Sequence, residues 1–260
     1  MADLEVLGIY REERFSPGKV EDDRAILDVV GDDLRRQGFA VRMLDAERLA
    51  TLDEPPSLVF AMCQGSEALS WLDGAARRTA VVNHPDAIRA CHRVNLVERL
   101  AASGVPQPRW AFAGEGFPTS FGAGPWLKRG DVHAMEAGDV VRVFTAEEWD
   151  AIAARFRDRG ITRAIVQEHV EGAVYKFYGV RGGFFRAYGL PAGSEAEAAS
   201  LAERGALALG LEVYGGDGVR ALDGALSLID FNDWPSFARC RRDAGAAIGR
   251  RLSDLLKRRR

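Results

Sequence analysis

The most informative stretch of this 260-residue chain is IDFNDWP, residues Ile229 to Pro235. It closes a predicted strand, 225–231, on which alternation turns Asp230 and Asn232 to one face. Two oxygen donors on one face suit magnesium, a hard cation that also takes phosphate oxygens. Asp217, on a neighbouring predicted strand, offers a further oxygen. Because an Asp-x-Asn pair is also a common turn former at a strand end, the hypothesis of a metal site depends on the residues around it.

Cations recur on the strands that precede this stretch. Lys128 ends the apolar run 124–128, Lys176 lies in VYKFY (174–178) and Arg186 in FFRAY (184–188). On a half-exposed strand such a side chain lies in solvent, but in an apolar setting it is costly to bury without an anion. Several cations opposite a carboxylate pair are what a nucleoside triphosphate and its metal need.

Short apolar runs alternate with helical patterns over residues 4–82, which predicts a small parallel α/β domain. From residue 109 onward the strand patterns come in hairpins and predict an antiparallel sheet. A single helix is expected over 87–103, separate strands over 211–214 and 218–222, and a last helix over 237–256. The predicted fold class is therefore α/β plus α+β, with one domain over 1–83 and a second over 84–260.

The composition excludes several classes of protein. With 35 basic and 38 acidic residues the chain has no general positive field for nucleic acid. Three widely spaced cysteines form no CxxC pair, which argues against a disulfide framework or a zinc site. No apolar run approaches the length of a membrane span. We expect a cytoplasmic protein that acts on a small molecule, with no nucleic-acid or membrane partner; the sequence does not indicate an oligomeric state.

Taken in order, these elements resemble the ATP-grasp superfamily over roughly residues 80 to 255. The resemblance rests on Asn83 before a helix, GVPQP (104–108), WLK (126–128), QEHV (167–170), Lys176, Asp217 and the IDFNDWP stretch. It implies a nucleotide held between two α+β subdomains, about 109–172 and 173–260, with ATP and Mg²⁺ as cofactors.

The resemblance also implies roles for individual residues. Lys128 would contact ATP, and a hinge of Gln167, Glu168, His169 and Val170 would contact the adenine and ribose. The loop 129–138 has fewer glycines than is usual for the superfamily, and His133 in this loop becomes a candidate phosphate contact. Lys176 would meet phosphate or the second substrate, helped by Arg186 or Arg220. The metal ligands would be Asp217, Asp230 and Asn232, and Arg93 stands where many members have a lysine.

Three functions fit these features. The first is an ATP- and Mg-dependent ligase, similar to RimK-like carboxylate–amine ligases, that activates a carboxylate as an acylphosphate for attack by an amine, a thiol or a similar nucleophile. The second is a small-molecule kinase similar to ATP-grasp inositol-phosphate kinases, whose substrate would be a phosphorylated polyol. A dense basic pocket for it would draw on Arg89, His92, Arg93, Arg181, Arg186 and Arg220. The third is an ATP-binding module without turnover.

Overall fold

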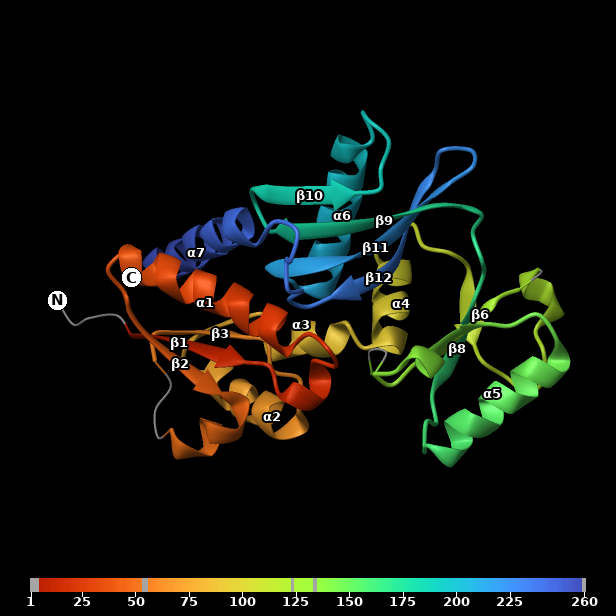
Figure 1. Ribbon diagram of the computed structural model, residues 1–260, viewed down its shortest axis with the longest axis horizontal. Coiled ribbons are helices and arrows are strands. Elements are labelled where there is room, and N and C mark those ends of the chain that lie inside the picture. The colour runs from red at the N-terminus through yellow and green to blue at the C-terminus, as the bar shows by residue number, and fades with distance from the viewer. Residues whose placement is uncertain (1–4, 53–55, 123, 133–134, 259–260) are drawn as a thin grey trace.

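The computed structural model describes residues 5–52, 56–122, 124–132 and 135–258. This part of the chain forms three four-stranded sheets with helices packed against them (Figure 1). We call them the N-terminal, central and C-terminal sheets. Short 3-10 helices lie between these elements: η1 (Glu13–Phe15), η2 (Ala46–Thr51), η3 (Thr119–Phe121) and η4 (Ala137–Asp139).

The N-terminal sheet is parallel throughout, as the alternation of strands and helices predicts. Its order is β2-β1-β3-β4, from β1 (Glu5–Tyr10), β2 (Ala40–Asp45), β3 (Leu58–Ala61) and β4 (Ala80–Val82). Successive side chains point to opposite faces, so Val6 and Phe60 pack toward α1 (Val20–Arg36), whereas Leu7 and Val59 pack toward α2 (Ser66–Ala76).

The last helix, α7 (Arg241–Lys257), lies alongside α1 (Figure 1). Its buried residues Ile248, Leu252 and Leu256 join one core with Ile26 and Leu27 of α1. The C-terminal end of the chain therefore completes the core of the N-terminal sheet. The division of the chain at residues 83 and 84 stays a prediction.

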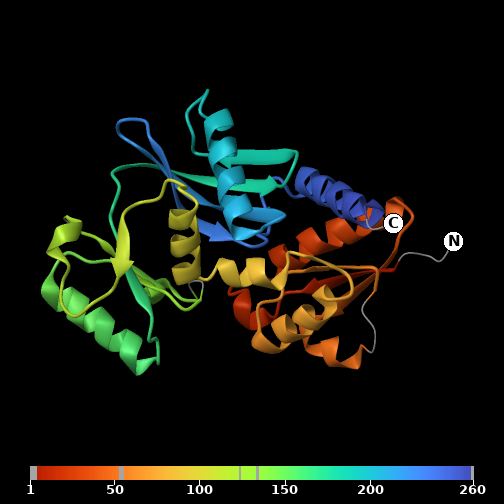
Figure 2. The same cartoon turned by 180° about the vertical axis from the view of Figure 1, so that it is seen from behind.

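The C-terminal sheet is antiparallel, as predicted from its hairpin pattern. Its order is β10-β9-β11-β12, from β9 (Gly172–Val180), β10 (Phe184–Tyr188), β11 (Val213–Ala221) and β12 (Leu226–Asn232). Figure 2 shows α6 (Glu195–Leu209) lying across one face, and its apolar residues share a core with those of α3 (Pro85–Ala90) and α4 (Arg93–Ala102). The other face carries the site described below.

The expectation of two separate strands over 211–214 and 218–222 is wrong, because β11 runs through the glycines between them. Those glycines leave room that the packing needs. A Cβ on Gly216 would lie 2.2 Å from the backbone oxygen of Asp230, and one on Gly218 would lie 2.3 Å from the ring of Tyr175. Glycine weakens an isolated strand, but here it permits the close approach of neighbouring groups.

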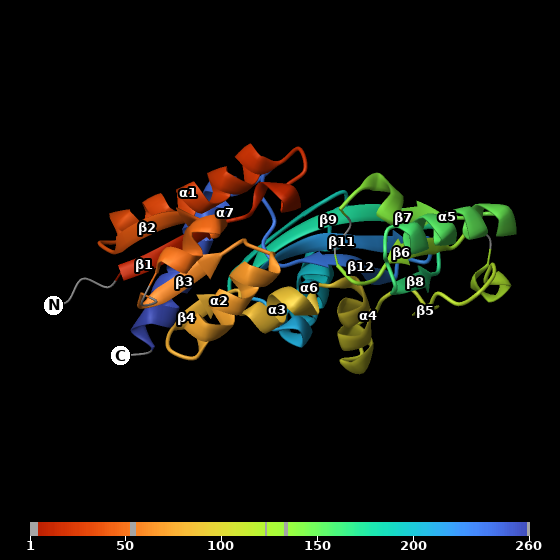
Figure 3. The same ribbon diagram turned by 90° about the horizontal axis from the view of Figure 1, so that it is seen from below.

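The central sheet has the order β5-β8-β6-β7 and is also antiparallel. Its strands are β5 (Trp110–Phe112), which the sequence does not predict, β6 (Trp126–Arg129), β7 (Val140–Arg142) and β8 (Ala164–Gln167). Helix α5 (Ala146–Asp158) covers one face with Trp149, Ile152 and Phe156. On the other face Ile165 meets Val94 and Val97 of α4, so α4 contributes to both the central and the C-terminal cores (Figure 3).

The expectation of one helix over 87–103 is wrong. The chain leaves helical geometry at His92, which has an extended backbone (φ −59, ψ 133), and α3 and α4 lie on either side. Tertiary hydrogen bonds favour the break: the Asn95 amide donates to the Arg89 carbonyl at the end of α3 (2.8 Å), and the Val94 N–H donates to the Gly130 carbonyl (3.0 Å). No helix among the described residues has the length and apolar character that a membrane span requires.

Asn83, at the end of β4, joins the N-terminal sheet to the C-terminal one. Its side chain is fully buried. The Nδ2 atom donates to the carbonyls of Val213 and Asp233, both at 2.7 Å. The Oδ1 atom accepts from the N–H groups of Glu212 (2.8 Å) and Val213 (3.0 Å). One amide therefore satisfies four backbone groups.

We expect Asn83→Ala to lower the free energy of unfolding by about 3 kcal/mol or more, because buried polar groups without a partner cost about 1–3 kcal/mol each. Urea denaturation measures the change. Gln107→Ala, which removes a single hydrogen bond to the Val97 carbonyl, should cost about 1 kcal/mol. Equal losses in the two variants would contradict a special role for Asn83.

Candidate functional site

A row of charged side chains crosses the C-terminal sheet on the face opposite α6. Lys176 of β9 pairs in register with Asp217 of β11, and Asp217 pairs with Asp230 of β12. Residues in register across antiparallel strands share a face. The Lys176 Nζ lies 2.8 Å from an Asp217 oxygen, and Asn232 follows on the same face as Asp230. The structure thus brings together the lysine and the three predicted metal ligands.

A bulge in β12 gives Asp230 this orientation. Gly218 pairs with Leu228 and Asp217 pairs with Asp230, so Ile229 is an extra residue on its strand. Before the bulge Leu228 packs toward α6, and after it Phe231 does so. Without the extra residue Asp230 would share the face of Leu228 and point into the apolar core. Alternation alone predicts that Asp230 and Asn232 share a face but does not say which face it is.

Lys128 of β6 approaches from the central sheet. Its side chain lies on the face opposite α5, where its Nζ donates to the Gln167 Oε1 of β8 at 2.5 Å. Burial, and then the charge of Arg93, lower the pKa of the Lys128 ammonium from 10.5 to about 7, against the opposing pull of Asp230 and Asp217. The ammonium therefore lies within electrostatic range of the carboxylates on the C-terminal sheet.

Arg93 is the second buried cation of the site. It is the first residue of α4, only 3% exposed, and its Nη1 lies 3.7 Å from an Asp230 oxygen. Its Nε is buried and has no hydrogen-bond partner among the described residues. The helix break at His92 and the bond from Val94 to Gly130 fix the start of α4 against the central sheet. The sequence prediction of a continuous helix gave no reason for Arg93 to be buried.

Lys128 and Arg93 are buried cations that, in the described part of the chain, lie near only two carboxylates, Asp217 and Asp230, so this site can accommodate an anion. A guanidinium and an ammonium lose hydration when they are buried, and this cost is recovered when charged oxygens surround them. The carboxylates of Asp217 and Asp230 lie on the facing sheet, where a divalent cation could bridge them to a phosphate. The arrangement can thus hold a polyphosphate and its metal between the central and C-terminal sheets.

The predicted hinge lies where the chain passes from β8 to β9. Gln167 is buried and holds Lys128, whereas Glu168 is 41% exposed and pairs with Arg109 at 3.4 Å. The His169 Nδ1 accepts a hydrogen bond from the Trp126 indole N–H at 3.2 Å. Val170 is half-buried in the same connection. The contact of these residues with a nucleotide stays a prediction.

Two predicted cations are not gathered with the others. Arg186 is on the same face as Lys176 but on the edge strand β10, exposed and stacked over Phe184 at 5.2 Å. Arg220 pairs in register with Ala173 and Leu226, on the opposite face of the sheet. His133 lies outside the described residues.

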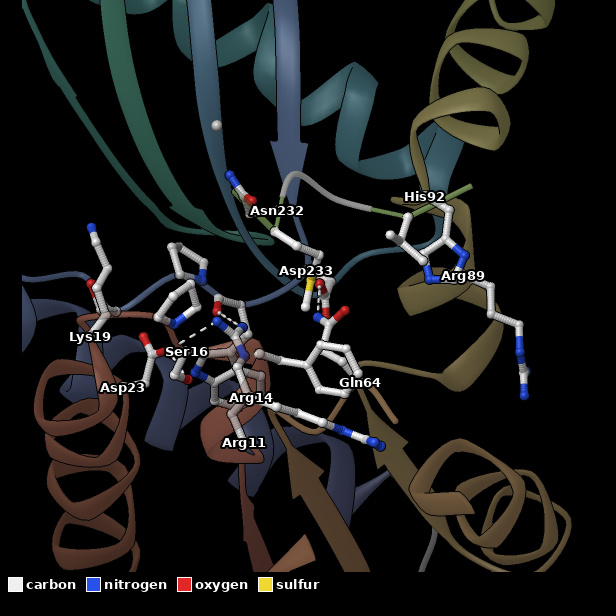
Figure 4. A pocket seen from close by; sticks show the side chains of 18 of the residues that line it. Arg11, Arg14, Ser16, Lys19, Asp23, Gln64, Arg89, His92, Asn232 and Asp233 are labelled. Carbon is white, nitrogen blue, oxygen red and sulfur yellow. Dashed lines mark hydrogen bonds and ion pairs between the residues drawn. The ribbon is translucent and has the colours of Figure 1, made fainter. Parts of the chain in front are cut away.

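A cavity of about 880 Å³ opens beside this site (Figure 4). It lies between the ends of the N-terminal strands and the C-terminal sheet, where parallel sheets commonly bind ligands. Lys176 and Asn232 of the predicted ligase site line it, and so do Arg89 and His92, two of the residues expected to form a basic pocket in a kinase. Sequence reasoning missed most of the other lining residues, such as Arg11, Gln64 and Asp233. Only Asp233 had a signal, since it directly follows a predicted metal ligand.

Three residues at the ends of N-terminal strands hold the segment that follows Asn232. Arg11, after β1, donates to the Trp234 carbonyl at 2.9 Å, and Gln64, after β3, donates to an Asp233 oxygen at 2.7 Å. Asn83 donates to the Asp233 carbonyl. The predicted metal ligand Asn232 is therefore positioned from both sides, by its own sheet and by the N-terminal one.

The site fits a magnesium ion. No group of three His, Cys, Asp or Glu side chains suited to a metal occurs among the described residues. Magnesium does not need such a cage, because it is commonly held by one or two carboxylates together with substrate phosphates and water. Asp217 and Asp230 on adjacent strands, with the Asn232 amide nearby, supply that set.

Comparison with solved structures identifies the fold. No protein-family model matches the sequence, and no curated protein matches it. The D-alanine–D-alanine ligase from Bacillus anthracis complexed with ATP superposes with a TM-score of 0.75 at 11% identity, over 100% of this chain and 99% of that one. The chain has the ATP-grasp fold.

Other similar structures have the same architecture. The D-alanyl-alanine synthetase A from Vibrio cholerae gives a TM-score of 0.71 at 12% identity, over 99% of this chain and 98% of that one. The D-alanine–D-alanine ligase from Coxiella burnetii gives 0.72 at 12% identity, over 98% and 94%. The similarity covers the N-terminal sheet as well as the central and C-terminal sheets.

If Lys128 contacts the phosphates as predicted, its depressed pKa should make nucleotide binding depend on pH. An anion binds the protonated form, and free Lys128 loses its proton as the pH rises through about 7. We expect the affinity for an ATP analogue to fall between about pH 7 and 9, by up to about tenfold per unit. Isothermal titration calorimetry should show proton uptake on binding at the upper end of this range.

Lys128→Arg is the matched control, because an arginine stays charged throughout this range. Its affinity should vary less with pH than that of the wild type, and binding should take up fewer protons. The same pH profile in both proteins would show that Lys128 does not contact the phosphates.

Lys176 and Asp217 form an ion pair, with 2.8 Å between the Nζ and a carboxylate oxygen. Lys176→Met removes a cation that competes with a metal for this carboxylate, so Mn²⁺ alone should bind more tightly, by about tenfold. Electron paramagnetic resonance of free Mn²⁺ measures this. A weaker or unchanged affinity would argue against Asp217 as a metal ligand.

Proposed function

We propose that the protein is an ATP- and magnesium-dependent ligase that activates a substrate carboxylate as an acylphosphate for attack by an amine or a similar nucleophile. The observation that carries this proposal is the convergence of the buried cations Lys128 and Arg93 on the carboxylates Asp217 and Asp230. Support also comes from similar structures, which by their names join D-alanine to D-alanine, one of them in complex with ATP.

The residues of the chain have distinct tasks in this reaction. Lys128 and Arg93 bind the phosphates and keep water from them, since both are buried. Asp217, Asp230 and Asn232 would hold magnesium, which neutralises charge on the transferred phosphoryl group and orients it. Lys176, next to Asp217, faces the cavity and can meet both a γ-phosphate oxygen and the substrate carboxylate.

The ligase reaction has two steps. A carboxylate oxygen attacks the γ-phosphorus, the bond to the bridging oxygen breaks and ADP leaves. The nucleophile then attacks the acyl carbon, phosphate leaves with its electron pair and the nucleophile loses a proton. The cavity beside Lys176 and Asn232 offers space for both substrates at the phosphoryl end.

The kinase alternative has less support, because the arginines that would bind a polyanion are dispersed. Arg89 lines the cavity, but its guanidinium is engaged in a bidentate pair with Asp73. Arg181 pairs with Glu212 at 3.3 Å, and Arg220 lies on the opposite face of its sheet. No dense basic pocket forms from them.

The direct test incubates the protein with ATP, magnesium and pooled carboxylates and amines. We expect ADP and free phosphate in equal amounts, together with a condensation product found by mass spectrometry. ADP with a phosphorylated product and no free phosphate would contradict the ligase and favour the kinase. Nucleotide binding without turnover on any pool would favour a non-catalytic module.

Once turnover is found, Asp230→Asn and Arg93→Met should each lower kcat by about 100-fold or more, because both groups stabilise charge at the transferred phosphoryl. Arg220→Ala is the control and should stay within about twofold, since its side chain lies on the other face. A normal rate in Arg93→Met, or a loss in Arg220→Ala equal to that in Arg93→Met, would contradict the assignment.

A further inference from the structure

The cavity has two walls of different character. Lys176 and Asn232 mark the phosphoryl end on the C-terminal sheet, and the segment from Arg11 to Lys19, between β1 and α1, forms the wall that faces it. Figure 4 shows Arg11 and Arg14 on the side of the cavity opposite Asn232. A substrate whose carboxylate reacts at the first wall therefore extends toward the second.

Most charges that line the cavity are already engaged by the protein. Arg11 pairs with Asp23 at 3.0 Å, Lys176 with Asp217 at 2.8 Å, and Arg89 with Asp73 at 2.6 Å. These pairs account for three of the five lysines and arginines among the lining residues. Arg14 and Lys19 are the other two, and neither has an ion pair with any described residue.

The carboxylates of the lining are engaged as well. Asp23 is 4% exposed and accepts hydrogen bonds from Arg11 (3.0 Å) and Ser16 (2.8 Å). Asp233 is 1% exposed and accepts one from Gln64. A positively charged group on a substrate would compete with these contacts, whereas a negatively charged group would meet cations with no ion-pair partner. The cavity therefore favours an anion at the wall formed by residues 11–19.

The structure holds Arg14 in position for that task. Its guanidinium stacks over Phe15, 4.8 Å from the ring centroid. A Cβ on Gly65 would lie 2.7 Å from the Arg14 Nη2 and 2.5 Å from the Glu12 Oε1. The oxygens of Glu12 accept the backbone N–H groups of Gln64 (3.0 Å) and Gly65 (2.9 Å). Glu12 thus braces the start of α2, and the absence of a side chain at Gly65 leaves room for the Arg14 guanidinium.

We propose that Arg14 binds a second carboxylate of the substrate, so that the acid activated by the enzyme is a dicarboxylic acid, with or without an amide group in its chain. A guanidinium suits a planar carboxylate because its N–H groups match the two oxygens. This inference rests on the proposed function, which supplies the reacting carboxylate at the other end of the cavity.

The test uses matched pairs of acids that differ only in one carboxylate: glutarate against glutaramate, and N-acetylglutamate against N-acetylglutamine. Binding is measured by calorimetry with Mg²⁺ and a non-hydrolysable ATP analogue, so that turnover is not needed. We expect the diacid of at least one pair to bind at least about tenfold more tightly than its amide. Arg14→Gln should abolish this preference, and Arg48→Gln, an exposed arginine outside the cavity, should retain it.

Three outcomes would overturn the proposal. They are equal affinity for the diacid and the amide in both pairs, no binding of any of the four acids, or a preference for the diacid that persists in Arg14→Gln. The thermal midpoint without acid checks that Arg14→Gln folds like the wild type. ADP release is measured on the same pairs. A preference for the diacid that depends on Arg14, without ADP release, would sustain the carboxylate site and contradict the ligase.

Discussion

The contact between Arg93 and Asp230 connects the parts from which the site is built. Arg93 starts α4, which packs on the central sheet, and Asp230 belongs to the C-terminal sheet. The buried Arg93 guanidinium needs this contact or another anion in its place, because a buried charge left alone is strongly destabilising. Lys128, on β6 of the central sheet, lies in the electrostatic field of Asp230 and Asp217. Neither sheet forms the site by itself.

The N-terminal sheet fixes the other side of the same region. Arg11, Gln64 and Asn83 follow three different parallel strands, and each donates a hydrogen bond to Asp233 or Trp234. The backbone that follows the predicted metal ligand Asn232 is therefore tied to the strand ends that border the cavity. A substrate bound in the cavity and a nucleotide bound between the sheets would therefore contact the same connected group of residues. A reaction between them requires that their relative positions be fixed in this way.

Much of this arrangement can be predicted from sequence, for identifiable reasons. Buried parallel strands appear in the sequence as short apolar runs. The strands β9 and β10 of the hairpin are predicted directly from their alternation of polar and apolar residues. The spacing of Asp230 and Asn232 places them on one face whatever the rest of the fold is. The features that sequence reasoning missed are tertiary. The helix break at His92 depends on the hydrogen bond to the Gly130 carbonyl. Glycine is needed at positions 216 and 218 of β11 because Asp230 and Tyr175 approach the strand too closely for a Cβ atom. The wall formed by residues 11–19 has no periodic signal, because its contacts lie far away in the chain.

A double-mutant cycle tests the central claim most directly, namely that Lys128 and Arg93 bind one triphosphate. The affinity for a Mg²⁺–ATP analogue would be measured by calorimetry in the wild type, Lys128→Met, Arg93→Met and the double variant. Our account predicts that each single variant loses about 10- to 100-fold, and that the losses in the double variant do not simply add, because the two cations contact the same ligand. Wild-type affinity in both single variants would contradict it.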